Sequence, residues 1–112
     1  MEIQEQRHGA VTVIKPVGPL VQGDAAQFRT HVQEVMVRSL GRFVVDASGI
    51  AFVDSLGLEA MLAASEELAA GGRSMRVCAA SETLREVLEL TGLDDRFEHY
   101  LDVNLAVRSF LA

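Results

Sequence analysis

Two adjacent polar residues, Asp54 and Ser55, stand where an apolar run gives way to a segment with helical periodicity. They fall at the first turn of the expected helix, where backbone N–H groups have no partner within the helix and the helix dipole is positive. Such a position favours an acceptor side chain, or a phosphate attached to a hydroxyl. The pair could therefore hold the helix end, carry a phosphate on Ser55, or do both.

The simplest role for this pair is an N-cap, since Asp and Ser are among the residues most favoured there. A reciprocal capping box needs Glu or Gln three residues after the cap, but Gly57 follows Asp54 and Leu58 follows Ser55 at that spacing. Capping also needs only one polar residue. One member of the pair is therefore free for another task.

A serine at a strand-to-helix turn is also a possible nucleophile, and Asp54-Ser55-Leu56 is similar to the Gly-Asp-Ser-Leu signature of one esterase family. Val53 stands in the place of the Gly, and the spacing from Asp95 to His99 differs from the Asp-x-x-His of those esterases. No other histidine is placed as a base for Ser55. We expect no enzyme, with a serine esterase as the remote alternative and no catalytic residue assigned.

Composition and charge exclude several other classes of function. The net charge of −6 and ten dispersed basic residues argue against nucleic-acid binding, which needs Lys and Arg to neutralise phosphates. Cys78 is the only cysteine and is expected in a buried strand, and the histidines are His8, His31 and His99, so we expect no metal site and no cofactor. No run is long and apolar enough for a membrane span, which favours a cytoplasmic protein without membrane insertion.

The chain is expected to form one domain over residues 1–112, because 112 residues with 49% apolar content suit a single core. Alternating and helical patterns predict an α/β fold with a mixed, mostly parallel sheet of about five strands in the order β-β-α-β-α-β-α-β-α. The predicted strands are Glu2–Arg7, Ala10–Lys15, Phe43–Ala47, Ser74–Ala79 and Phe97–Tyr100. The predicted helices run from Asp24 to Leu40, from Asp54-Ser55 to Gly71-Gly72, from Ser81 to Thr91-Gly92, and onward from Asp102.

Several details of these elements can be tested against the structure. Pro16 and Pro19 are expected to end the second strand, and Asp24 is a plausible N-cap of the first helix. Asp94-Asp95 is expected to form a turn. The first helix is expected to bury Phe28, Val32, Val35, Met36 and Leu40, and the last helix Val103, Ala106, Val107, Phe110 and Leu111.

The predicted sheet also places the central pair. Strand, helix and strand in a short span form a right-handed parallel crossover. The start of the central helix therefore lies at the carboxyl edge of the sheet, where ligands and partners of such folds usually bind.

Four short segments carry a resemblance to a known family. They are Asp54-Ser55-Leu56-Gly57-Leu58 at the central helix, Gly18-Pro19-Leu20 before the first helix, Val44-Val45-Asp46 in the third strand, and Leu90-Thr91-Gly92-Leu93-Asp94. With the order of elements, they resemble the sulphate transporter and anti-sigma factor antagonist (STAS) domain over nearly the whole chain. The stand-alone bacterial antagonists are the most similar group.

The resemblance implies a partner-switching function. In that family the Ser directly after Asp is phosphorylated by an anti-sigma factor that is also a serine kinase, and this residue is Ser55 here. Unphosphorylated, the chain would bind the kinase, and phosphorylated it would release it, with a phosphatase as a possible resetting partner. The implied partner-binding residues are Asp24, Asp54, Ser55, Leu56, Gly57 and Glu59.

Two positions depart from the family pattern and keep an alternative open. Leu56 replaces a second hydroxyl residue and Glu59 replaces a small glycine. The alternative is a STAS subunit of an ABC-type lipid transporter, which would bind the transporter's ATPase without a phosphorylation cycle.

Overall fold

The fold opens with an antiparallel hairpin of β1 (Glu2–His8) and β2 (Val11–Val17) in a computed structural model that describes residues 1–111. The second strand runs past the predicted end at Pro16. The N–H of Thr12 donates to Arg42 on the β3 side of the strand, and alternation places the nitrogen of Pro16 on the same side. Proline has no backbone N–H to donate to a neighbouring strand. Because pairing with β3 ends at Ile14, no hydrogen bond to β3 is required at Pro16, and the strand continues through it.

Three parallel strands complete the sheet: β3 (Phe43–Asp46), β4 (Met75–Cys78) and β5 (Phe97–Tyr100). The sheet order is β1-β2-β3-β4-β5, with β2, β3, β4 and β5 parallel to one another. This confirms the predicted mixed, mostly parallel sheet. Val44 and Val45 are both fully buried on β3, as expected of a strand covered on both faces.

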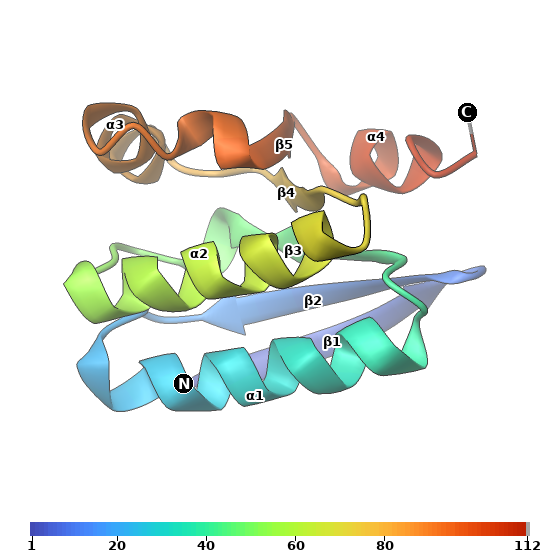
Figure 1. The fold of residues 1–112 in the computed structure, drawn as a ribbon, viewed down its shortest axis with the longest axis horizontal. Helices are drawn as coiled ribbons and strands as arrows, with labels where there is room; N and C mark the ends of the chain where they lie inside the picture. Colours follow the sequence, from blue (N-terminus) through green and yellow to red (C-terminus); the bar gives the residue numbers. More distant parts are fainter. Residues whose placement is uncertain (112) are drawn as a thin grey trace.

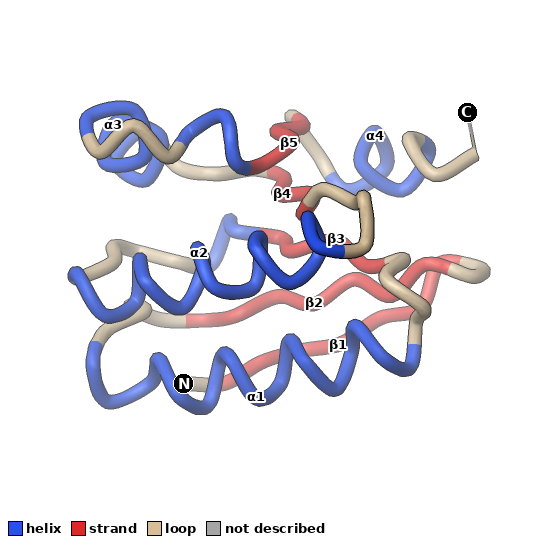
Figure 2. Tube along the Cα trace, in the orientation of Figure 1, coloured by secondary structure: helices blue, strands red, loops and turns tan. Residues whose placement is uncertain are grey.

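Four α-helices cover the two faces of the sheet. They are α1 (Gln22–Arg38), α2 (Ser55–Ala70), α3 (Glu82–Leu90) and α4 (Val103–Arg108), with short 3₁₀ turns at Ala47–Gly49 and Asp94–Arg96. Figure 1 shows α1 and α2 side by side in front of the strands, and Figure 2 separates the helices from the sheet by colour. No helix within residues 1–111 is long and apolar enough to span a membrane.

The core divides at the sheet. The larger cluster joins α1, α2 and α3 to one face, and the smaller cluster joins Ala106 of α4 to Val11, Val13, Val44 and Cys78 on the other. Cys78 is buried in β4, as predicted. The core therefore holds α1 and α2 against the same sheet face, which brings their N-terminal ends to one edge of the molecule.

Two residues predicted to lie in the core are exposed instead. α1 ends at Arg38, and Leu40 adopts a left-handed conformation in the following turn (φ 56°), where 67% of it is exposed. α4 ends at Arg108, so Leu111 leaves the helical periodicity and is 81% exposed. Both predictions were wrong because the helices stop before the apolar pattern does.

Candidate functional site

The carboxylate of Asp54 joins the starts of two helices. Asp54 is the N-cap of α2, with extended backbone, and its Oδ1 accepts a hydrogen bond from the Gly57 N–H at 2.8 Å. Its Oδ2 accepts a second bond, also at 2.8 Å, from the N–H of Gln22, the first residue of α1. One side chain therefore satisfies an unpaired helix-end donor in both α1 and α2.

The start of α1 differs from the prediction. Asp24 was expected to cap this helix, but α1 begins at Gln22, behind Val21, whose side chain makes no capping hydrogen bond. Asp24 lies within the first turn, half-buried, with its Oδ1 2.9 Å from the amino nitrogen of Met1. The bond from Asp54 explains how α1 can begin without a polar residue of its own at the cap.

Backbone contacts fix the two helix starts in register. Leu20 forms a parallel bridge with Val53, its N–H donates to the carbonyl of Phe52 at 2.9 Å, and its carbonyl accepts from the Asp54 N–H at 3.2 Å. Gly57 is buried against this segment, and a Cβ added to it would lie 2.0 Å from the Leu20 carbonyl oxygen. Only glycine permits this approach, so the buried Gly57 allows the start of α2 to pack closely against Leu20.

Ser55 occupies the first helical position after the cap. It is exposed, and its hydroxyl has no hydrogen-bond partner among residues 1–111. Since Asp54 supplies the cap, Ser55 is the member of the pair that is left free, as the sequence indicated. It stands in the first turn of α2, where the helix dipole is positive, and this position suits an attached phosphate.

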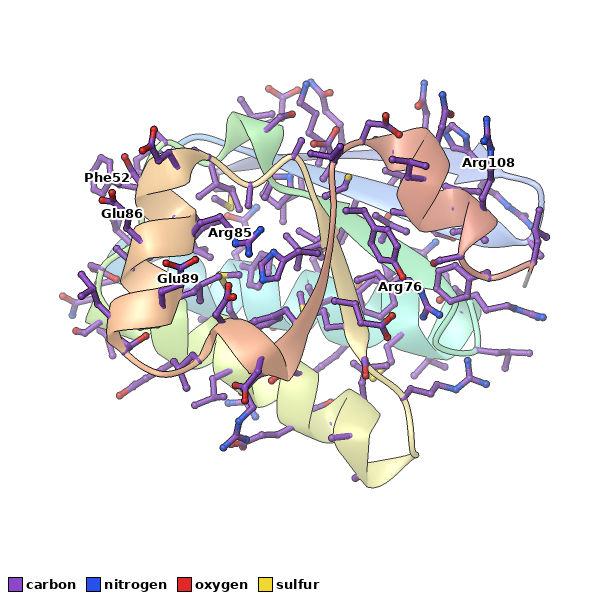
Figure 3. All side chains as sticks on the ribbon, turned by 90° about the horizontal axis from the view of Figure 1, so that it is seen from above. Phe52, Arg76, Arg85, Glu86, Glu89 and Arg108 are labelled. Carbon is purple, nitrogen blue, oxygen red and sulfur yellow. The ribbon has the colours of Figure 1, made fainter. Side chains whose placement is uncertain are left out.

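Apolar side chains flank Ser55. Phe52 is 52% exposed in the loop before α2, and Leu56 is 38% exposed immediately after Ser55. In Figure 3, Phe52 lies at the outer edge of the molecule, on the same side as Glu86 and Glu89 of α3. Two exposed apolar side chains therefore lie within three residues of the exposed Ser55 along the chain.

A shallow groove of about 310 Å³ continues this surface between α1 and α2. The charged residues that line the groove are Arg29 and Glu59. The Nη2 atom of Arg29 also lies 3.6 Å from Glu67 Oε1. The groove is lined by Gln22, Ala25, Ala26, Arg29, Leu56, Glu59 and Ala60. The structure thus brings Leu56 and Glu59 together with the first turns of α1.

The charge at the site is negative. The N–H of Gly57, followed by that of Gln22, lowers the pKa of the Asp54 carboxyl below its usual value, against the opposing effect of desolvation. Asp54 is therefore ionised near neutral pH, and the acidic residue Glu59 is exposed on the next turn. A phosphate on Ser55 would add further negative charge to this end of the molecule.

A separate polar cluster ties α3 to β5. Asp94 lies in the predicted turn, and its Oδ1 forms an ion pair with Arg85 Nε at 3.2 Å. The same oxygen lies 3.0 Å from His99 Nε2, but the geometry of this contact is not that of a hydrogen bond. Burial, followed by the charge of Arg85, lowers the pKa of His99, while Asp94 opposes the shift. Within residues 1–111, no group of three or more His, Cys, Asp or Glu residues is placed to hold a metal ion.

Sequence reasoning did not single out Phe52, Arg29 or the Gln22 amide. An aromatic residue inside an apolar run is typical of a core, and a lone arginine on a helix gives no signal of what it faces. The bond from Gln22 to Asp54 joins residues 32 positions apart. Only the tertiary structure shows it.

Known proteins share this fold. An anti-sigma factor antagonist from Mycobacterium paratuberculosis is 25% identical with a TM-score of 0.84, over 99% of this chain and 94% of that chain. A candidate anti-sigma factor antagonist from Thermotoga maritima is 18% identical with a TM-score of 0.88, over 98% and 95%. The phosphorylated form of the Bacillus cell fate determinant SpoIIAA is 20% identical with a TM-score of 0.70, over 96% and 99%.

Sequence comparison shows the family. No curated protein sequence gives a significant match. The sequence model of the STAS domain family, however, matches residues 2–106, which include every strand and the site around Asp54 and Ser55. The chain therefore belongs to the STAS domain family.

Proposed function

We propose that the chain is an anti-sigma factor antagonist that binds a kinase-type anti-sigma factor and releases it when Ser55 is phosphorylated. The observation that carries the proposal is the exposed Ser55 hydroxyl, unbonded among residues 1–111, directly behind the Asp54 cap. The structural neighbours support it, since they include anti-sigma factor antagonists and a phosphorylated SpoIIAA.

The proposed binding region, here called the switch surface, combines the loop before α2 with the first turns of α1 and α2. Phe52 and Leu56 supply its apolar area, and Glu59 supplies charge beside them. Gly57 contributes by allowing the close approach to Leu20. The switch surface consists of Asp24, Phe52, Asp54, Ser55, Leu56 and Glu59.

A phosphate on this surface acts mainly at the interface. It adds about 1.5 to 2 negative charges and three strong acceptor oxygens. At a helix N-terminus this charge gains roughly 0.3 to 1 kcal/mol from the dipole, and repulsion from the carboxylates of Asp54 and Glu59 opposes the gain, so these two direct effects largely offset each other. Burying the same dianion against a partner without a matching cation costs about 4 kcal/mol, a roughly thousandfold loss of affinity.

Phosphoryl transfer needs a nucleotide and magnesium to neutralise the charge that develops on the transferred group. We assign both to the kinase partner, and we assign the return to the unphosphorylated state to a phosphatase. The exposed position of Ser55 allows either enzyme to reach the oxygen. We place this cycle in the cytoplasm, where sigma factors act.

A second candidate keeps the same surface but not the phosphorylation cycle: a STAS subunit that binds the ATPase of an ABC-type lipid transporter. The observation in its favour is Leu56, an exposed apolar side chain that could hold a partner regardless of the charge on Ser55. The two candidates differ in how binding responds to charge at position 55.

Affinity capture from the host lysate separates them. The baits are the parent chain, Ser55→Ala, Ser55→Glu and the control Asn104→Glu, which adds the same charge to the exposed first turn of α4. The proposal expects a kinase-fold anti-sigma factor with all baits except Ser55→Glu. Equal capture of that protein by Ser55→Glu would contradict the switch, and equal capture of a transporter ATPase by all baits would establish the second candidate.

A further inference from the structure

α1 depends on a residue of another helix for its start. Its N-cap residue is Val21, and the Gln22 N–H is held by Asp54 Oδ2 at 2.8 Å. The other oxygen of the same carboxylate holds the Gly57 N–H of α2 at 2.8 Å. Because one carboxylate accepts both bonds, a rotation of the Asp54 side chain that breaks one of them also disturbs the other.

We infer that Asp54 is a positioning residue that couples the charge on Ser55 to the start of α1. Negative charge at Ser55 breaks the bond between Asp54 and the Gln22 N–H, and the first turn of α1 then loosens. The inference rests on the proposed function only in taking Ser55 as the residue that acquires the charge.

Competition for donors explains the coupling. Ser55 lies one residue after the cap, so the oxygens of a phosphate on it reach the same first-turn N–H groups that Asp54 now holds. A phosphate is the stronger acceptor, with three oxygens and up to two charges. Two adjacent anions also repel each other, so the carboxylate turns away from the start of α2 and leaves Gln22.

The neighbouring charges do not offset this repulsion. The charged side chains on the first two turns of α1 and α2 are Asp24 and Glu59, both acidic, and the amino group of Met1 near this turn is already paired with Asp24 at 2.9 Å. The cation of the adjoining groove is Arg29, which lies on the third turn of α1 and is shared with Glu67 of α2.

The consequence falls on the groove between α1 and α2, which adjoins the switch surface. Gln22, Ala25 and Ala26 of α1 form one wall of the groove whose other wall carries Leu56 and Glu59 of α2. When α1 loosens at its first turn, this wall is no longer fixed relative to Ser55. A partner that fits both walls therefore loses contacts in addition to meeting the phosphate charge.

NMR spectroscopy of the isolated chain tests the coupling without a partner. In the parent chain, the amide protons of Gln22 and Gly57 should shift together as pH is lowered, with one midpoint below the usual value for an aspartate, because both report the same carboxylate. In Asp54→Asn, which keeps a capping side chain, neither amide should follow that titration.

Charge at position 55 is then varied with matched controls. In Ser55→Glu and in enzymatically phosphorylated protein, the Gln22 amide proton should move at least halfway to its Asp54→Asn position and lose the titration. Ser55→Gln, of the same size without charge, and Asn104→Glu should behave as the parent. A Gln22 resonance and titration unchanged in Ser55→Glu and in the phosphorylated protein would overturn the inference, even if the same changes release a partner in a binding assay.

Discussion

The starts of α2 and α4 look alike in sequence but differ in the structure. Both follow an aspartate N-cap whose Oδ1 accepts the N–H three residues later at 2.8 Å, from Gly57 to Asp54 and from Leu105 to Asp102. At α2 the carboxylate also holds the first residue of α1. At α4 the residue after the cap is Val103, which packs on the smaller core cluster.

This difference shows what turns a helix start into a candidate site. A cap alone stabilises an end, and many helices have one. The α2 start adds a free hydroxyl at Ser55, exposed apolar neighbours, and a second helix whose start depends on the same carboxylate. The comparison can be broken or sharpened by changing equivalent positions in the two helices.

The third helical position should give the largest difference in stability. Gly57→Ala places a Cβ 2.0 Å from the Leu20 carbonyl oxygen, so the backbone must move, and we expect a loss of about 3 kcal/mol in the free energy of unfolding. Leu105→Ala, at the same position of α4, removes a partly exposed side chain and should cost under about 1 kcal/mol. Urea denaturation measures both, and similar values would contradict the role given to Gly57.

The apolar neighbours should give the next largest effect, on binding. Phe52→Ser should weaken binding of the anti-sigma factor by about 2 kcal/mol, roughly thirtyfold, because an exposed aromatic residue beside Ser55 is a typical interface anchor. Leu105→Ser removes an exposed apolar residue from α4 and should leave the affinity unchanged. Titration calorimetry gives both values, and equal losses would show that Phe52 has no special place in the interface.

The caps themselves should differ by a smaller amount. Asp54→Ala leaves helix-end donors of two helices without a partner, whereas Asp102→Ala leaves those of one. We therefore expect the urea midpoint to fall about twice as far for Asp54→Ala as for Asp102→Ala. Equal shifts would mean that the bond to Gln22 adds nothing to the stability of the chain.

The smallest effect should appear as a dependence on pH. The bonds from Gly57 and Gln22 hold the pKa of Asp54 below the ordinary value of 3.8, so the ionised form stabilises the folded state. That stability is present above the unfolded-state pKa and is lost as pH falls through the folded-state pKa. The stability gap between the parent and Asp54→Asn should therefore close on acidification, as thermal unfolding at several pH values would reveal. A gap that stays constant would contradict the shifted pKa.

Much of the fold could be predicted because its signals are local. Apolar runs, glycine stops and the Asp102 and Ser81 caps act within a few residues, and the strands and helices follow in the predicted order. Two of the failures lie where an element depends on distant contacts. Pro16 stays in a strand because pairing with β3 ends earlier, and α1 begins at Gln22 because Asp54 is folded against it.

The candidate site shows the same division. The sequence indicated that one of Asp54 and Ser55 caps α2 and the other is free, and the structure assigns the cap to Asp54. It did not indicate that Gly57 is buried or that Phe52 is exposed, since both depend on how the segment at Leu20 packs against the start of α2.

The most direct test of the account is the affinity of the captured anti-sigma factor for the chain with and without phosphate on Ser55, measured by titration calorimetry on purified proteins. The account predicts tight binding of the unphosphorylated chain and binding weaker by about a thousandfold after phosphorylation. Equal affinities for the two forms would contradict the switch at Ser55.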